Sequence, residues 1–301
     1  MMSTLAGVQE LEATALGMSM ARERPEWEGK LMATMGAGYA VVAKHCVGSI
    51  HLIVFAREVL LKDIKDTHSA HVLTGLGAVV ANKAGVGVCF DVLETSFLFV
   101  TARFSAEGVA DRNRDFSRID EGLAELMCPA VVRTSPSSVA NARDGRLLLA
   151  GDGGRNGGKH GGAHGLRWSA SALFDRVFWL GDFNYCIEGD ADVVRKALDV
   201  GGGSLQELLG LDQLRAEMAQ GACFRGFQEP SVVFRPTYKY DAWSDAYDSS
   251  PKTRYDSRTL LDAMPPACRG SLAGPMLAAA HLSRPGRKSQ KPRVTFGAKQ
   301  E

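Results

Sequence analysis

The sequence predicts an α/β protein, because short apolar runs typical of strands alternate with stretches of helical pattern. The clearest strand is VFWL at residues 177–180, whose unbroken apolar character is typical of a strand buried on both faces. The clearest helical pattern lies within residues 191–219, where VVRKALDV and LQELLGLDQLRAEMA flank three glycines. With 301 residues, of which 45% are hydrophobic, the chain has enough material for one large core. We therefore expect a single domain over residues 1–301.

Other elements follow from the same patterns. A further helix is predicted at residues 27–35. Further strands are predicted at residues 4–10, 39–42, 50–55, 95–101 and 232–234. Residues 129–168 contain a Ser/Pro-rich run and a glycine tract at 151–165, which predict a Gly/Ser-rich surface insertion without a core of its own.

Composition limits the binding partners and the cellular compartment to be expected for this protein. The formal net charge is +1, so no global field favours nucleic acid, and we expect no nucleic-acid partner. Six cysteines are scattered without a CxxC pair, which favours reduced thiols in a cytoplasmic protein over a disulfide framework or a zinc site. No signal peptide and no apolar run long enough to span a bilayer are recognisable. Any membrane contact is therefore expected to be peripheral.

The strand at 177–180 ends in Gly181-Asp182-Phe183-Asn184. Gly181 permits a tight turn, and this turn would bring the Asp182 carboxylate and the Asn184 amide to the end of the strand. A carboxylate can take a proton from water or lie near a metal, and an amide can orient an attacking water or donate to a phosphate oxygen. From these four residues alone, an ordinary Asp/Asn turn is the alternative interpretation.

The wider string WLGDFNY resembles WLGDxNYRI, the active-site motif of the inositol polyphosphate 5-phosphatases in the endonuclease/exonuclease/phosphatase superfamily. The resemblance continues in chain order. It includes TGLG at 74–77, NKAGV at 82–86, RNRD at 112–115, DQL at 212–214, PTYKYD at 236–241, YDSS at 247–250 and KTR at 252–254. It implies a four-layer sandwich of two facing mixed β-sheets flanked by helices. It also implies a phosphoric monoester hydrolase that removes the 5-phosphate of phosphoinositides or soluble inositol polyphosphates with Mg²⁺.

The resemblance also implies roles for single residues. Glu10 matches the glutamate that holds magnesium in the family, although an ordinary exposed glutamate is the alternative without the surrounding match. Asp182 would activate water, and Asn184 would hold water or phosphate oxygens. The implied substrate-binding residues are Tyr238, Lys239, Lys252 and Arg254, together with Arg103. Glu10, Asp182 and Asn184 are expected to converge.

The chain departs from the family pattern at several positions. Arg103 stands where the family has an active-site histidine, and an arginine can bind phosphate but does not exchange protons near neutral pH. With Arg258 placed on the family's arginine, Ser257 stands where an aspartate is expected. The alternative anchor, Pro266-Ala267-Cys268-Arg269, also lacks this aspartate, and Ser289-Gln290-Lys291 replaces a terminal Ser-Asp-His. We expect residues 255–301 to be a degraded part of the domain, and the chain to begin after the family's first strand.

Three functional hypotheses follow. One is a magnesium-dependent 5-phosphatase, and the second is a catalytically impaired phosphoinositide-binding protein or scaffold in which binding outlasts catalysis. The third is nucleotide binding through GxxxxGKH at 153–160. A phosphate-binding loop requires Ser or Thr where His160 stands, and the glycines that follow would weaken the required helix.

Overall fold

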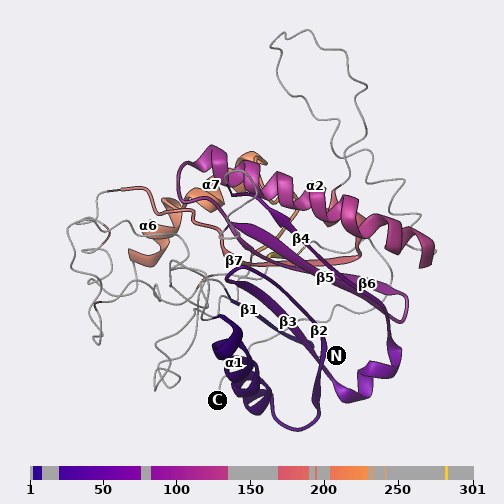
Figure 1. Cartoon of the computed structure of the whole chain (residues 1–301). Helices are drawn as coiled ribbons and strands as arrows, with labels where there is room; N and C mark the ends of the chain where they lie inside the picture. Colours follow the sequence, from indigo (N-terminus) through magenta and orange to yellow (C-terminus); the bar gives the residue numbers. More distant parts are fainter. Residues whose placement is uncertain are drawn as a thin grey trace.

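The structure is a computed structural model that describes residues 3–8, 20–75, 83–134, 169–189, 194, 204–229, 232, 241 and 282–283. Its described strands form two sheets (Figure 1). The smaller sheet has the order β1 (Ser3–Val8), β3 (Ile50–Arg57), β2 (Tyr39–Val47), with antiparallel pairs. The larger sheet has the order β4 (Ile64–Leu73), β5 (Ala84–Val92), β6 (Thr95–Arg103), β7 (Arg176–Asp182), β8 (Leu282–Ser283). It is mixed, because β6 and β7 run parallel.

The predicted layered sandwich is confirmed. The sheets face each other through one apolar cluster, to which β3 contributes Leu52 and Val54 and β5 contributes Val86 and Val88. The other face of β3 presents Ile53 and Phe55 to helix α1 (Met20–Met35). Helix α2 (Val109–Thr134) covers the outer face of the larger sheet (Figure 1). The short α4 (Ala170–Leu173) packs in the same apolar cluster. The order of layers is therefore helix, sheet, sheet, helix.

The glycines of β5 let α2 approach the sheet. A Cβ atom on Gly85 would lie 2.2 Å from Cγ2 of Ile119, and one on Gly87 would lie 2.9 Å from Cε of Met127. The groups that come close to both glycines are side chains of α2. Small residues in β5 therefore allow the helix to pack tightly on the sheet.

The strand predicted around residues 177–180 is β7, and both of its faces pack against other apolar side chains. Trp179 packs in the cluster beneath α2, while Phe178 stacks on Phe99 on the side of the smaller sheet. Gly181 was expected in a tight turn but lies inside β7, opposite Ala102. Its φ is 132°, and a Cβ atom there would lie 2.1 Å from the Ala102 carbonyl oxygen. Glycine is needed here for close backbone contact.

Other predicted boundaries also differ from the structure. The helical pattern after residue 203 is broken into α6 (Ser204–Gly210) and α7 (Gln213–Gln220). The break arises because Asp212 is extended and caps α7, accepting a hydrogen bond from the Leu214 amide at 2.9 Å. Strand β2 continues to Val47, and α2 continues through residues 129–134, which were assigned to the insertion.

A short 3₁₀ helix, η1 (Glu58–Asp63), links β3 to β4. Of the strand predicted at 232–234, only the buried Val232 is described. The glycine tract at 151–165 and the candidate nucleotide loop lie outside the described residues. Within the part of the chain that the structure does describe, no helix is both long and apolar enough to cross a membrane.

Candidate active site

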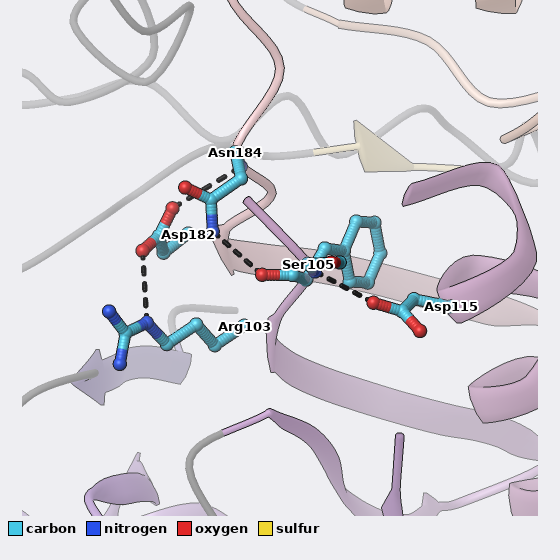
Figure 2. Close-up of polar contacts among 6 residues, drawn as sticks. Arg103, Ser105, Asp115, Asp182 and Asn184 are labelled. Atoms are coloured by element: carbon cyan, nitrogen blue, oxygen red, sulfur yellow. Dashed lines mark hydrogen bonds and ion pairs between the residues drawn. The ribbon is translucent and has the colours of Figure 1, made fainter. Parts of the chain in front are cut away.

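Asp182 and Asn184 lie together where β7 ends (Figure 2). Both are 4% exposed. Asn184 has φ 57°, a left-handed conformation that asparagine tolerates better than most residues. In this conformation its backbone N–H donates to Asp182 Oδ1 at 3.2 Å. One compact turn therefore presents a carboxylate and an amide side by side.

The end of β6 forms the other side of the site. The Phe104 amide donates to the Asp182 carbonyl at 2.9 Å, and the Phe104 carbonyl accepts from Nδ2 of Asn184 at 2.7 Å. The parallel pairing of β6 and β7 thus continues beyond the strands and holds the Asn184 side chain. An amide NH₂ carries two hydrogens, so this bond does not by itself prevent donation to a second acceptor.

Arg103 contacts Asp182 directly. It is the last residue of β6 and pairs in register with Asp182, the last residue of β7. Its Nε donates to Asp182 Oδ2 (Figure 2). The two atoms lie 3.3 Å apart, and the Arg103 side chain is 17% exposed. The structure therefore places Arg103 in the site as a counterion of Asp182. This ion pair has to loosen before Oδ2 can accept a proton from water.

Asp115, for which the sequence predicted no role, supports the end of β6. It lies on α2 and is 6% exposed, and its Oδ2 accepts a hydrogen bond from the Ser105 amide at 2.7 Å. Burial raises the pKa of Asp115, and the Ser105 amide and the charges of Arg118 and Lys83 act in the opposite direction. The sequence signal that could have found Asp115 is the RNRD motif at 112–115, which is part of the family resemblance.

The structure brings together three of the predicted site residues: Asp182, Asn184 and Arg103. The others lie outside the described residues, so the predicted convergence with Asp182 and Asn184 stays a prediction. These others are Glu10, Tyr238, Lys239, Lys252 and Arg254.

The described part of the site only partly fits a divalent metal. The oxygens of Asp182 and Asn184 are of the type that Mg²⁺ and Ca²⁺ prefer. However, Asp182 Oδ2 faces the Arg103 guanidinium, itself a cation, and Asp115 is engaged by the Ser105 amide. Among the described residues, no three His, Cys, Asp or Glu side chains are grouped to hold a metal. A metal site here therefore needs a ligand such as Glu10.

Comparison with known proteins identifies the relatives of this chain. A profile of endonuclease/exonuclease/phosphatase family 2 matches residues 3–260. Phosphatidylinositol polyphosphate 5-phosphatase type IV of Pan troglodytes is 31% identical over 281 residues, which cover 91% of this chain and 38% of the relative. The chain thus spans well under half the length of this curated relative.

Solved structures agree on the fold. The inositol polyphosphate 5-phosphatase domain of SPsynaptojanin, in complex with inositol (1,4)-bisphosphate and a calcium ion, superposes with a TM-score of 0.63 at 25% identity. The match covers 94% of this chain and 66% of that one. A Cimex nitrophorin, solved as a ferrous NO complex, matches with a TM-score of 0.57 at 19% identity over 94% of this chain and 75% of that one, and therefore shows the fold alone. The chain belongs to endonuclease/exonuclease/phosphatase family 2, among the inositol polyphosphate 5-phosphatases.

Proposed function

We propose that this chain hydrolyses the 5-phosphate monoester of an inositol polyphosphate or phosphoinositide with the help of Mg²⁺. The observation that carries the proposal is the buried Asp182–Asn184 turn, which is held against the end of β6 and lies within the motif that resembles the family's active site. A carboxylate and an amide held in this way can position a water molecule for attack on phosphorus.

Arg103 would change partners during this reaction. A phosphate monoester carries more negative charge than a carboxylate and matches the planar guanidinium fork, so bound substrate would compete with Asp182 for Arg103. Release of Asp182 Oδ2 would then allow it to take a proton from the attacking water, while Asn184 orients that water or a phosphate oxygen. Positioning and charge neutralisation provide most of the rate enhancement in phosphoryl transfer.

The remaining groups that we propose lie outside the described residues. Lys239, Lys252 and Arg254, with Tyr238, would bind the phosphates that are not cleaved. Glu10 would be the protein ligand of Mg²⁺, which when bound withdraws negative charge from the phosphoryl oxygens. Because this metal assignment depends on Glu10, it is tested directly by comparing the Mg²⁺ concentration that Glu10→Gln and the wild type require for activity.

The substrate class is supported by the ligand of the SPsynaptojanin domain. Inositol (1,4)-bisphosphate is what remains when inositol 1,4,5-trisphosphate loses its 5-phosphate. For a lipid substrate with the same headgroup, we propose a cytoplasmic enzyme that contacts membranes only peripherally.

The experiment is phosphate release from inositol 1,4,5-trisphosphate in the presence of Mg²⁺. Asp182→Asn should lower kcat/KM by about 10²–10³-fold or more. Asp111→Asn is the matched control, because Asp111 lies at the start of α2 and pairs there with Arg114. Turnover that Asp182→Asn leaves unchanged would contradict the proposed role.

A second function is favoured by the Arg103–Asp182 ion pair. This contact neutralises the carboxylate that should act as base, as expected for a phosphoinositide-binding protein with impaired catalysis. Liposome binding that is lost in Lys239→Ala/Arg254→Ala, without turnover in the wild type, would support this alternative.

A further inference from the structure

We propose that the first turns of α2 act as a clamp, in which Asn113 and Asp115 are positioning residues for the two strand ends that form the site. The inference rests on the proposed function for its catalytic consequence, but not for its geometry. Side chains two residues apart on a helix point to opposite sides. Asn113 and Asp115 therefore reach in different directions from one rigid element.

Asn113 holds the end of β7 in the site through its contact with Tyr185. Tyr185 directly follows Asn184 and is fully buried, and its hydroxyl donates to Asn113 Oδ1 at 2.6 Å. Burial raises the pKa of Tyr185, and the nearby Cys223 thiol and Glu217 carboxylate act in the same direction. The hydroxyl therefore keeps its proton and stays a donor to Asn113.

The Asn113 amide is itself oriented by a third element. Its Nδ2 donates to Glu217 Oε2 at 2.6 Å, and Glu217 lies on α7. With Nδ2 donating to this carboxylate, Oδ1 faces Tyr185 and accepts from its hydroxyl. The chain of contacts runs from α7 through α2 to the residue after Asn184.

Arg112 packs against the same ring. Its guanidinium carbon lies 5.5 Å from the Tyr185 ring centroid, and the residue is 1% exposed. A cation over an aromatic face is favourable when both are removed from water. Tyr185 is therefore held at its ring by Arg112 and at its hydroxyl by Asn113.

Asp115 holds the end of β6. Its bond to the Ser105 amide fixes the backbone one residue beyond Phe104, whose carbonyl accepts the Asn184 side chain. The next residue, Phe116, packs on Trp179 of β7 with ring centroids 5.0 Å apart, which secures the helix to the sheet. Both chain segments that orient Asn184 are thus tied to the same helical turns, and Figure 2 shows the contact of Asp115 with Ser105.

The clamp should act on rate more than on affinity. In the proposed mechanism Asn113, Asp115 and Glu217 bind no substrate, so weakening them displaces Asp182 and Asn184 without removing a binding contact. Small misplacements of catalytic groups, or loss of the outer groups that orient them, typically cost about 10- to 100-fold in activity. This loss should appear in kcat, with KM nearly unchanged.

The test exchanges donor and acceptor across the Asn113–Glu217 contact. Asn113→Asp alone places two carboxylates together and should lower kcat about 10- to 100-fold. Asn113→Asp with Glu217→Gln restores a donor, an acceptor and the original total charge, and should recover most of kcat. Tyr185→Phe removes only the hydroxyl and should resemble Asn113→Asp. Asp111→Asn is the matched change that should have no effect.

Hydrogen exchange provides a readout that does not depend on activity. The Asn184 amide should exchange about tenfold faster in Asn113→Asp and in Tyr185→Phe than in the wild type, with the Leu180 amide within β7 as internal reference. In the double variant its exchange rate should return to the wild-type value. The Ser105 amide should respond in the same way to Asp115→Ala.

The outcomes separate the two proposals. An inactive wild type overturns the proposed function, whereas the exchange of Asn184 still tests the clamp. Unchanged Asn184 exchange in Tyr185→Phe, a variant that keeps the buried ring, overturns the clamp. A double variant no better than Asn113→Asp in both kcat and exchange also overturns it, and its recovery in both supports it.

Discussion

Arg103 Nε lies 3.3 Å from Asp182 Oδ2, across the parallel register that pairs the last residues of β6 and β7. A cation therefore occupies the position where the related 5-phosphatases are expected to have a histidine. The contact explains how one substitution can preserve the architecture of the site and still alter its chemistry, because the carboxylate now has a permanently charged partner.

We expect Arg103→His to raise kcat for inositol 1,4,5-trisphosphate by about tenfold or more, because histidine exchanges protons near neutral pH and frees Asp182 from the guanidinium. Phosphate release measured from pH 5.5 to 8.5 checks this. Arg103→Gln is the control, since it removes the charge without supplying a proton shuttle. Equal rates for the two variants would exclude a role for proton exchange at this position.

Gly181→Ala should destabilise the protein by more than about 3 kcal/mol, because the new methyl group would lie 2.1 Å from the Ala102 carbonyl oxygen at a φ of 132°. Gly29→Ala, on α1 with no atom within 4 Å of the new Cβ, should instead stabilise by about 0.5–1 kcal/mol. Urea unfolding of both variants checks the pair. A mild effect at Gly181 would mean that β7 shifts readily against β6.

Asp212 should make stability fall as pH rises from about 5 to 8. Burial, with the neighbouring Glu229, raises the pKa of Asp212 to about 7, while Arg215 opposes the shift. The folded state then binds a proton that the unfolded state has already released, so stability is lost as pH rises from the ordinary aspartate pKa to about 7. Asp212→Asn keeps an acceptor for the Leu214 amide and should remove about 1–3 kcal/mol of this dependence. Chemical denaturation at pH 5 and 8 measures it, and Glu207→Gln, exposed on α6, is the control.

His45 should produce the opposite dependence at lower pH. Its Nε2 lies 2.9 Å from Nδ1 of His71, and its Nδ1 lies 2.9 Å from the Ser69 hydroxyl, so it connects β2 of one sheet to β4 of the other. Burial, and then the charge of His71, lowers the pKa of His45. The unfolded state binds the proton more readily, so stability is lost as pH falls below about 6.5.

His71→Asn should reduce this loss, because an amide contacts His45 without charge. Unfolding at pH 5 and 7 measures it, and His68→Asn on the same strand is the control. If the variant and the wild type lose the same stability between these pH values, the contact between the sheets does not depend on the proton.

Local patterns were sufficient for much of the fold. The apolar run at 177–180 predicted β7, because a strand buried on both faces has apolar residues at successive positions. The alternation of strand and helix patterns predicted the α/β class. The extent of α2 and the break at Asp212 were not predicted. Helix α2 continues past Pro129. Asp212 caps α7 through the Leu214 amide, while its backbone pairs with the distant Ile187.

The sequence by itself determined that Asp182 and Asn184 belong to one turn, because residues two apart at a strand end cannot separate. Only the tertiary structure decided that Arg103 is the partner of Asp182, since 79 residues separate them and the register of two parallel strands brings them together. It also decided that Asn113 and Asp115 support the turn from α2. Spacing along a chain limits local geometry, whereas contacts between distant residues follow from how sheets and helices pack.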